Sequence, residues 1–66
     1  MKEQLLVEWE AVKKTNWDGR ALEQTKKQLE ILNQLQKIDP ILEIDGRSIA
    51  AQISSRQEQL TVISGD

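Results

Sequence analysis

Cysteine, histidine, tyrosine and phenylalanine are all absent from this sequence of 66 residues. Without cysteine no disulfide forms, and without cysteine or histidine there is no ordinary zinc site. The usual general bases and soft nucleophiles are missing too, since only Asp, Glu, Lys, Ser and Thr remain. Asp39 and Asp45 read as a cap and a solvent-facing acid, because no calcium-loop spacing surrounds them. We therefore expect a chain that is not an enzyme and that has no cofactor and no metal.

Charge of one sign and long apolar runs are also scarce. The chain has 9 basic and 11 acidic side chains, and the net charge of −2 favours neither nucleic acid nor an anionic membrane. No apolar run approaches the roughly 20 residues that span a bilayer. Residues 1–8 lack the apolar core of a secretion signal, and the absence of cysteine fits a reducing compartment. We expect a cytoplasmic chain without membrane insertion.

Helix-forming residues are what the sequence has in abundance. Gln, Leu, Glu, Ile and Lys dominate, and β-branched residues nowhere alternate with polar ones over a useful length. The expected fold class is therefore all-α. We expect a single helical domain over residues 1–66, close to the size at which one core becomes marginal. The pattern predicts an antiparallel helical hairpin with a shorter N-terminal helix, resembling a three-helix bundle, with helices over about 2–14, 17–38 and 40–63.

The first helix boundary lies between residues 15 and 19. Thr15 is a good N-cap for the second helix, and Asp18 three residues later resembles an acidic capping box. Gly19 lowers the helix propensity by roughly 1 kcal/mol relative to alanine. One continuous helix over 2–38 is the alternative. The break is favoured because it lets the first helix fold back on the second and bury both tryptophans.

The second boundary is Asp39-Pro40. A residue before proline is pushed out of the α region, and proline is accepted at the first position of a helix. These two residues therefore predict the N-cap and the first residue of the third helix. Asp45-Gly46 offers an alternative, because a turn at this pair would delay the helix until after it.

The third helix carries the most regular apolar stripe, which follows steps of four and three residues. Residues 17–38 carry two further stripes, and exposed apolar faces usually mark an interaction site. For Arg56, which interrupts the third stripe, either the stem follows an apolar surface with the head in water, or the residue contacts an acid on a partner. We expect the partner-binding residues to be Leu42, Ile49, Ile53, Arg56, Leu60 and Ile63.

Two segments resemble the FliT-type flagellar export chaperones, which are small all-helical bacterial proteins. The first is Asn16-Trp17-Asp18 leading into Leu22, Leu29, Leu32 and Leu35, similar to the family's acidic-Trp-Asp entry into its long second helix. The second is Ile41-Leu42-Glu43-Ile44-Asp45 followed by Ile49, Ile53, Arg56 and Leu60, similar to the family's Ile-Leu-x-x-Asp start of the later helix. The resemblance implies a cytoplasmic chaperone that shields the helical end of an export substrate, such as the filament cap protein, and docks at the export gate. Its contact surface would then include the stripe of the third helix.

The leading prediction is a non-enzymatic helical binding protein, a small cytoplasmic export chaperone or adaptor that buries a partner's amphipathic helix between the second and third helices. An alternative is a self-associating structural hairpin, a homodimer in which the stripe packs against its own copy. A third reading is a small nucleic-acid-binding regulator, from the basic residues around Trp17. Acidic residues are interleaved with those basic ones, so that a solvated face is favoured over a nucleic-acid surface.

Overall fold

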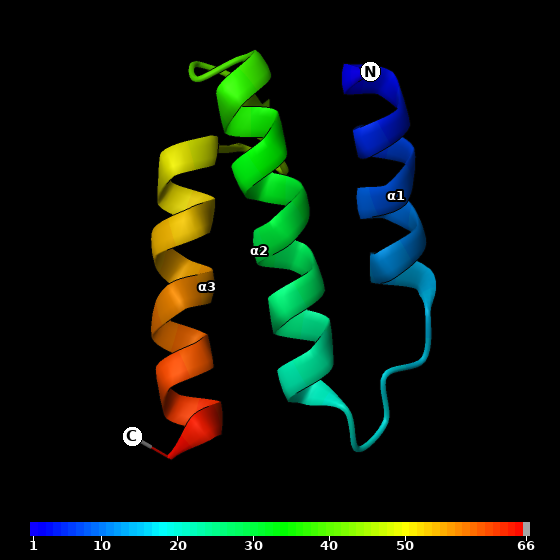
Figure 1. Ribbon diagram of the computed structural model, residues 1–66, viewed down its shortest axis with the longest axis vertical. Coiled ribbons are helices and arrows are strands. Elements are labelled where there is room, and N and C mark those ends of the chain that lie inside the picture. The colour runs from blue at the N-terminus through cyan, green and yellow to red at the C-terminus, as the bar shows by residue number, and fades with distance from the viewer. Residues whose placement is uncertain (66) are drawn as a thin grey trace.

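Residues 1–65, which the computed structural model describes, fold into three helices and one small β-hairpin (Figure 1). Helix α1 spans Lys2–Lys14, α2 spans Ala21–Ile38 and α3 spans Ile49–Ser64. The strands β1 (Glu43–Ile44) and β2 (Arg47–Ser48) lie between α2 and α3. In Figure 1, α2 lies in the middle with α1 on one side and α3 on the other. The prediction of an all-α, three-helix architecture is confirmed.

Helix α1 forms over the residues predicted for it. Leu5, Trp9 and Val12 are spaced four and three residues apart, so they share one face of the helix, and all three are buried. The helix ends at Thr15, where the backbone becomes extended. The buried residues are thus about one helical turn apart, so that only one side of α1 faces the core.

Helix α2 begins at Ala21 instead of residue 17. Gly19 explains the late start, because its φ of +76° is left-handed and does not fit inside a helix. The hydroxyl of Thr15 donates to the carbonyl of Ala11 at 2.7 Å and so closes α1 instead of capping α2. Arg20 precedes α2 and supplies no side-chain cap. The predicted break between the helices is confirmed, and the predicted capping box is wrong.

The two tryptophans lie at different levels of the bundle, with Trp9 beside Asp45 of the hairpin turn and Trp17 in the loop after α1. Trp9 is 1% exposed, and Trp17 in the connecting loop is partly buried against the core. The indole N–H of Trp17 donates to the carbonyl of Val12 at 2.8 Å. That bond satisfies one of the carbonyls that the end of α1 leaves without an intrahelical partner.

Helix α3 begins at Ile49 instead of Pro40, because Asp45-Gly46 forms a turn. The φ angles of Asp45 and Gly46 are +53° and +80°, and a two-residue type I′ hairpin turn requires left-handed backbone at both positions. The prediction of a helix from residue 40 is therefore wrong, and the alternative start after the turn is confirmed. Asp39 still ends α2, as predicted.

The hairpin leads directly into α3. Its strands pair antiparallel, with Glu43 opposite Ser48 and Ile44 opposite Arg47. Ser48 then acts as the N-cap of α3, where its hydroxyl accepts the backbone N–H of Ala51 at 3.2 Å. The residues expected to begin a helix thus form a turn, and Ser48, nine residues after the predicted cap Asp39, supplies the cap.

A hydrophobic core joins all the helices and the hairpin. Helix α2 packs against both α1 and α3, whereas no Cα atom of α1 lies within 8 Å of one in α3 among the described residues. Side chains therefore make the connection between these two outer helices. The buried apolar residues of the core are Leu5, Trp9, Val12, Leu29, Ile31, Leu32, Leu35, Ile44, Ile49 and Ile53.

Candidate partner-binding site

The residues predicted to contact a partner are buried to different degrees along α3. Ile49 is 0% exposed and Ile53 is 8% exposed, and both belong to the core of the chain itself. Neither can meet a partner while this fold is intact, so the prediction is not supported for these two residues. The predicted homodimer, in which the whole apolar stripe of α3 packs against a second copy, is not supported for the same reason, because part of that stripe is already buried within the chain.

The remaining predicted residues keep part of their surface exposed. Leu42 lies just before the hairpin, and Arg56, Leu60 and Ile63 follow one another down α3. Leu42 and Leu60 also pack against the core. The stripe on α3 is therefore sealed where the helix begins and partly open where it ends.

Arg56 contacts Trp9 across the gap between α3 and α1. Its guanidinium carbon lies 5.7 Å from the centroid of the indole ring, within the range of a cation–π contact. The Nε atom of Arg56 is buried and has no hydrogen-bond partner among the described residues. An apolar surface for Arg56 is thus supplied by Trp9, and the contact joins two helices whose backbones do not approach each other.

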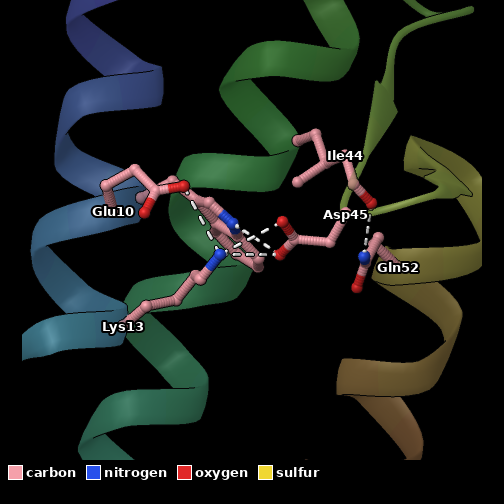
Figure 2. A network of polar contacts seen from close by, with 6 residues as sticks. Glu10, Lys13, Ile44, Asp45 and Gln52 are labelled. Atoms are coloured by element: carbon pink, nitrogen blue, oxygen red, sulfur yellow. Dashed lines mark hydrogen bonds and ion pairs between the residues drawn. The ribbon is translucent and has the colours of Figure 1, made fainter.

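The carboxylate of Asp45 receives hydrogen bonds from two side chains of α1 (Figure 2). The ammonium of Lys13 lies 3.1 Å from one oxygen and 3.0 Å from the other. The indole N–H of Trp9 lies 3.3 Å from the second oxygen. Lys13 also lies 3.4 Å from a carboxylate oxygen of Glu10. The turn residue of the hairpin is exposed to solvent, as predicted, and its carboxylate is also bonded to α1.

These ion pairs favour the charged forms of their members. The hydrogen bond from Lys13 holds the pKa of Asp45 below its usual range, and the indole N–H of Trp9 adds to this effect. The same hydrogen bond raises the pKa of Lys13. At the end of α2, Lys2 lies 2.9 Å from Asp39 and lowers the pKa of that carboxyl. The end of the molecule that holds the hairpin, called the hairpin end below, is thus joined to α1 by two ion pairs.

Gln52 completes the closure of the hairpin end from α3. Its side-chain amide is buried and donates to the carbonyl of Ile44 at 2.8 Å, as Figure 2 shows. This bond satisfies a strand carbonyl that faces the interior. Polar side chains from α1 and α3 therefore both hold the hairpin over the core.

The opposite end of the molecule, called the loop end below, comprises the loop 15–20, the start of α2 and the end of α3. A hollow of about 480 Å³ lies there between α2 and α3. The guanidinium of Arg20 lies 5.2 Å from the ring centroid of Trp17 at its edge. The residues that line this hollow are Gly19, Arg20, Ala21, Leu22, Glu23 and Ile63.

A second hollow lies on α1 alone, on the side away from the core. Its volume is about 440 Å³. Val7 lines it and is 67% exposed. The other residues that line it are Leu6, Glu10, Ala11 and Lys14.

Comparison with known proteins identifies no family, since the chain matches no protein-family model, no curated protein and no solved structure. The resemblance to the FliT-type chaperones stays a prediction. No helix in the described part of the chain is long and apolar enough to cross a bilayer. Residues 1–65 also contain no group of three acidic side chains placed to hold a metal ion.

Proposed function

We propose that this chain is a non-enzymatic helical binding protein, a small adaptor or chaperone that buries an amphipathic helix of another protein at its loop end. The observation that supports the proposal is the hollow between the start of α2 and the end of α3. Leu22 and Ile63 border this hollow and keep part of their apolar surface exposed. The same two helices are sealed at the hairpin end, where Ile49 is fully buried.

The size of the hollow selects the kind of contact. A volume of about 480 Å³ accepts one or two large side chains, but not a whole helix. A partner helix therefore lies along the end of α3 and inserts one aliphatic or aromatic side chain as an anchor. The rest of its apolar face covers Leu60 and Ile63. A central anchor in a pocket commonly carries most of the binding energy of such an interface.

Charged residues at the rim of the hollow favour a particular partner. Arg20 and Glu23 stand at the edge, one of each sign. Arg20 is held by its stacking on Trp17 and by a hydrogen bond from its Nη2 to the carbonyl of Asn16 at 3.2 Å. A guanidinium already fixed in place loses little freedom when it meets a carboxylate. The preferred helix thus carries an acidic residue beside its apolar anchor.

The sequence resemblance points to one such helix. A helical end segment of a flagellar filament cap protein is the partner that it implies. The contact surface on this chain is then Leu22, Arg56, Leu60 and Ile63, because Ile49 and Ile53 belong to the core.

Titration of the ¹⁵N-labelled chain with helical peptides, followed by NMR, tests the proposal. The panel holds designed amphipathic helices with and without a Leu or Phe anchor, a helical end segment of a filament cap protein, and scrambled peptides. We expect the shifts to concentrate at Leu22, Leu60 and Ile63, and the indole N–H signal of Trp17 to move more than that of Trp9.

Ile63→Ser should weaken peptide binding at least about tenfold, because it removes a buried aliphatic contact. Val62→Ser is the matched control, since Val62 is the preceding residue of the same helix, is 79% exposed and does not line the hollow. The proposal is wrong if no peptide shifts the loop-end signals. It is also wrong if binding persists in folded Leu22→Ser and Ile63→Ser variants.

A further inference from the structure

On the face of α1 that points away from the core, an apolar patch lies between charges of opposite sign. The patch contains Val7, which is 67% exposed, and Ala11 four residues later on the same helix. Glu3 and Lys14 are four residues before and seven residues after Val7. At 3.6 residues per turn these spacings place all three side chains on the same side of the helix.

Glu3 and Lys14 cannot pair with each other within one chain. They are 11 residues apart, which is roughly 16 Å along a helix at 1.5 Å per residue. The ion pairs found among residues 1–65 involve neither of them. The outer face of α1 therefore has an unpaired negative charge at one end, an unpaired positive charge at the other and an apolar centre.

We propose that a second copy of this chain covers this face, with the two α1 helices packed antiparallel about a two-fold axis near Val7 and Ala11. A two-fold interface is made by the same residues on both sides. Glu3 of each copy then lies opposite the partner's Lys14, so two ion pairs flank the centre. Val7 packs over the partner's Ala11, whose small side chain lets the helices approach closely.

Among the other charges of α1, Glu10 is the one that shares the outer face near the two-fold axis. Lys2 and Lys13 are already paired with Asp39 and Asp45 on the inner side. Glu10 lies close to the partner's Glu10 in this arrangement, and Lys13 at 3.4 Å offsets part of that repulsion. The dipoles of antiparallel helices also attract each other. A parallel pairing, in contrast, would set Glu3 against Glu3 and Lys14 against Lys14.

The interface is small. Two single helices of 13 residues bury less than the roughly 1,600 Å² of a standard protein interface. We therefore expect a reversible dimer that forms at micromolar concentrations and above and weakens as salt is added. It shares no residue with the loop-end hollow, so peptide binding and dimerisation are separate properties.

Sedimentation equilibrium of charge-swap variants tests the pairing. Glu3→Lys alone, or Lys14→Glu alone, replaces two attractive pairs by two repulsive ones, and each should raise the dimer Kd about tenfold. The double variant restores both pairs with reversed sign, and its Kd should return to within about threefold of the original value. Glu58→Lys on α3 is the control, because it makes the same charge change on an exposed residue of another helix.

The apolar centre is tested by Val7→Ser against Val62→Ser. Both valines are strongly exposed, so neither change should unfold the chain, and only the first should weaken the dimer. A wild-type chain that stays monomeric at concentrations up to about 1 mM overturns the proposal. A dimer that forms but does not respond to the single charge swaps, or is not restored in the double variant, overturns it as well.

Discussion

The two ends of the bundle have similar side chains but are closed to different degrees. At the hairpin end Trp9 and Ile49 are 1% and 0% exposed, and the carboxylate of Asp45 joins the hairpin to α1. At the loop end Trp17 and Ile63 are only partly buried, and a hollow remains between α2 and α3. The connections explain the difference, because the hairpin covers one end and buries Ile44 in the core. The same substitution made at each end tests whether the burial of a residue, and not its type, determines how much it contributes to the free energy of unfolding.

The largest difference should come from the two tryptophans. Trp9→Ala should lower the free energy of unfolding by about 3–5 kcal/mol, because it empties a fully buried site. This loss is close to the whole stability of about 5 kcal/mol expected for a small domain, so the variant should be largely unfolded. Trp17→Ala should lower it by only about 1–2 kcal/mol, since Trp17 is partly exposed. Urea unfolding followed by circular dichroism measures both, and equal losses would contradict the comparison.

Two isoleucines of α3 give the next largest difference. Ile49→Ala should lower the free energy of unfolding by about 3 kcal/mol, whereas Ile63→Ala should lower it by less than about 1 kcal/mol. The helix propensity gained is the same in both variants, because both residues lie within α3. Thermal and urea unfolding provide the values. A larger loss at Ile63 would mean that the loop end contributes more to the core than its exposure indicates.

Two glycines sharpen the comparison further. Gly19 and Gly46 have φ angles of +76° and +80°, and a Cβ at either position meets no atom within 4 Å. Gly19→Ala and Gly46→Ala should therefore have the same local strain, about 1 kcal/mol each. At Gly46, which the hairpin holds in place, we expect the whole strain to appear as a lower free energy of unfolding. At Gly19 we expect a smaller decrease in the free energy of unfolding, because the loop can adjust. Equal losses would show that the loop is as rigid as the hairpin.

The smallest effect concerns pH. Asp39 and Asp45 have pKa values lowered below 3.8 in the folded chain. Their ion pairs therefore stabilise the fold fully at pH values above the ordinary aspartate pKa of 3.8. This stabilisation is lost as the pH falls through the lower pKa values of the folded chain. Asp45→Asn should make the acid loss of stability shallower, and asparagine also tolerates the left-handed backbone of the turn.

Lys13→Gln removes the partner of Asp45 and should flatten the acid dependence in the same way. Combining it with Asp45→Asn should add little, because both changes abolish one interaction. Urea unfolding between about pH 2 and 7 measures this. If the free energy of unfolding falls with decreasing pH as steeply in both single variants as in the original chain, the pair contributes nothing to stability. This is true of many exposed ion pairs.

The three helices were predicted from periodicity, whereas the turn at Asp45-Gly46 was predicted only as an alternative and its two strands were not predicted. The spacing of Leu5, Trp9 and Val12 gave α1 its bounds and its buried face. Asp45-Gly46 is a strong signal for a two-residue hairpin turn, but the apolar stripe continues through it with helical spacing, and that spacing outweighed the turn. The strands are only two residues long, too short to show an alternating pattern.

The contacts that close the hairpin end could not be predicted. Lys13 and Asp45 are 32 residues apart, and single charges at that separation carry no pairing signal. The burial of Ile49 and Ile53 was missed for a related reason. A stripe of aliphatic residues has the same spacing whether it meets its own chain or another, and only the arrangement of α2 between the outer helices decides between the two.

The absence of backbone contact between α1 and α3 has a consequence for how the fold opens locally. Helix α2 packs against both outer helices, whereas α1 packs its backbone against α2 alone among the described helices. The remaining attachments of α1 to the hairpin end are the bond from Trp9 to Asp45 and two ion pairs with partly exposed members. In native-state hydrogen exchange the amides of α1 should therefore exchange through a partial opening, faster than those in the middle of α2.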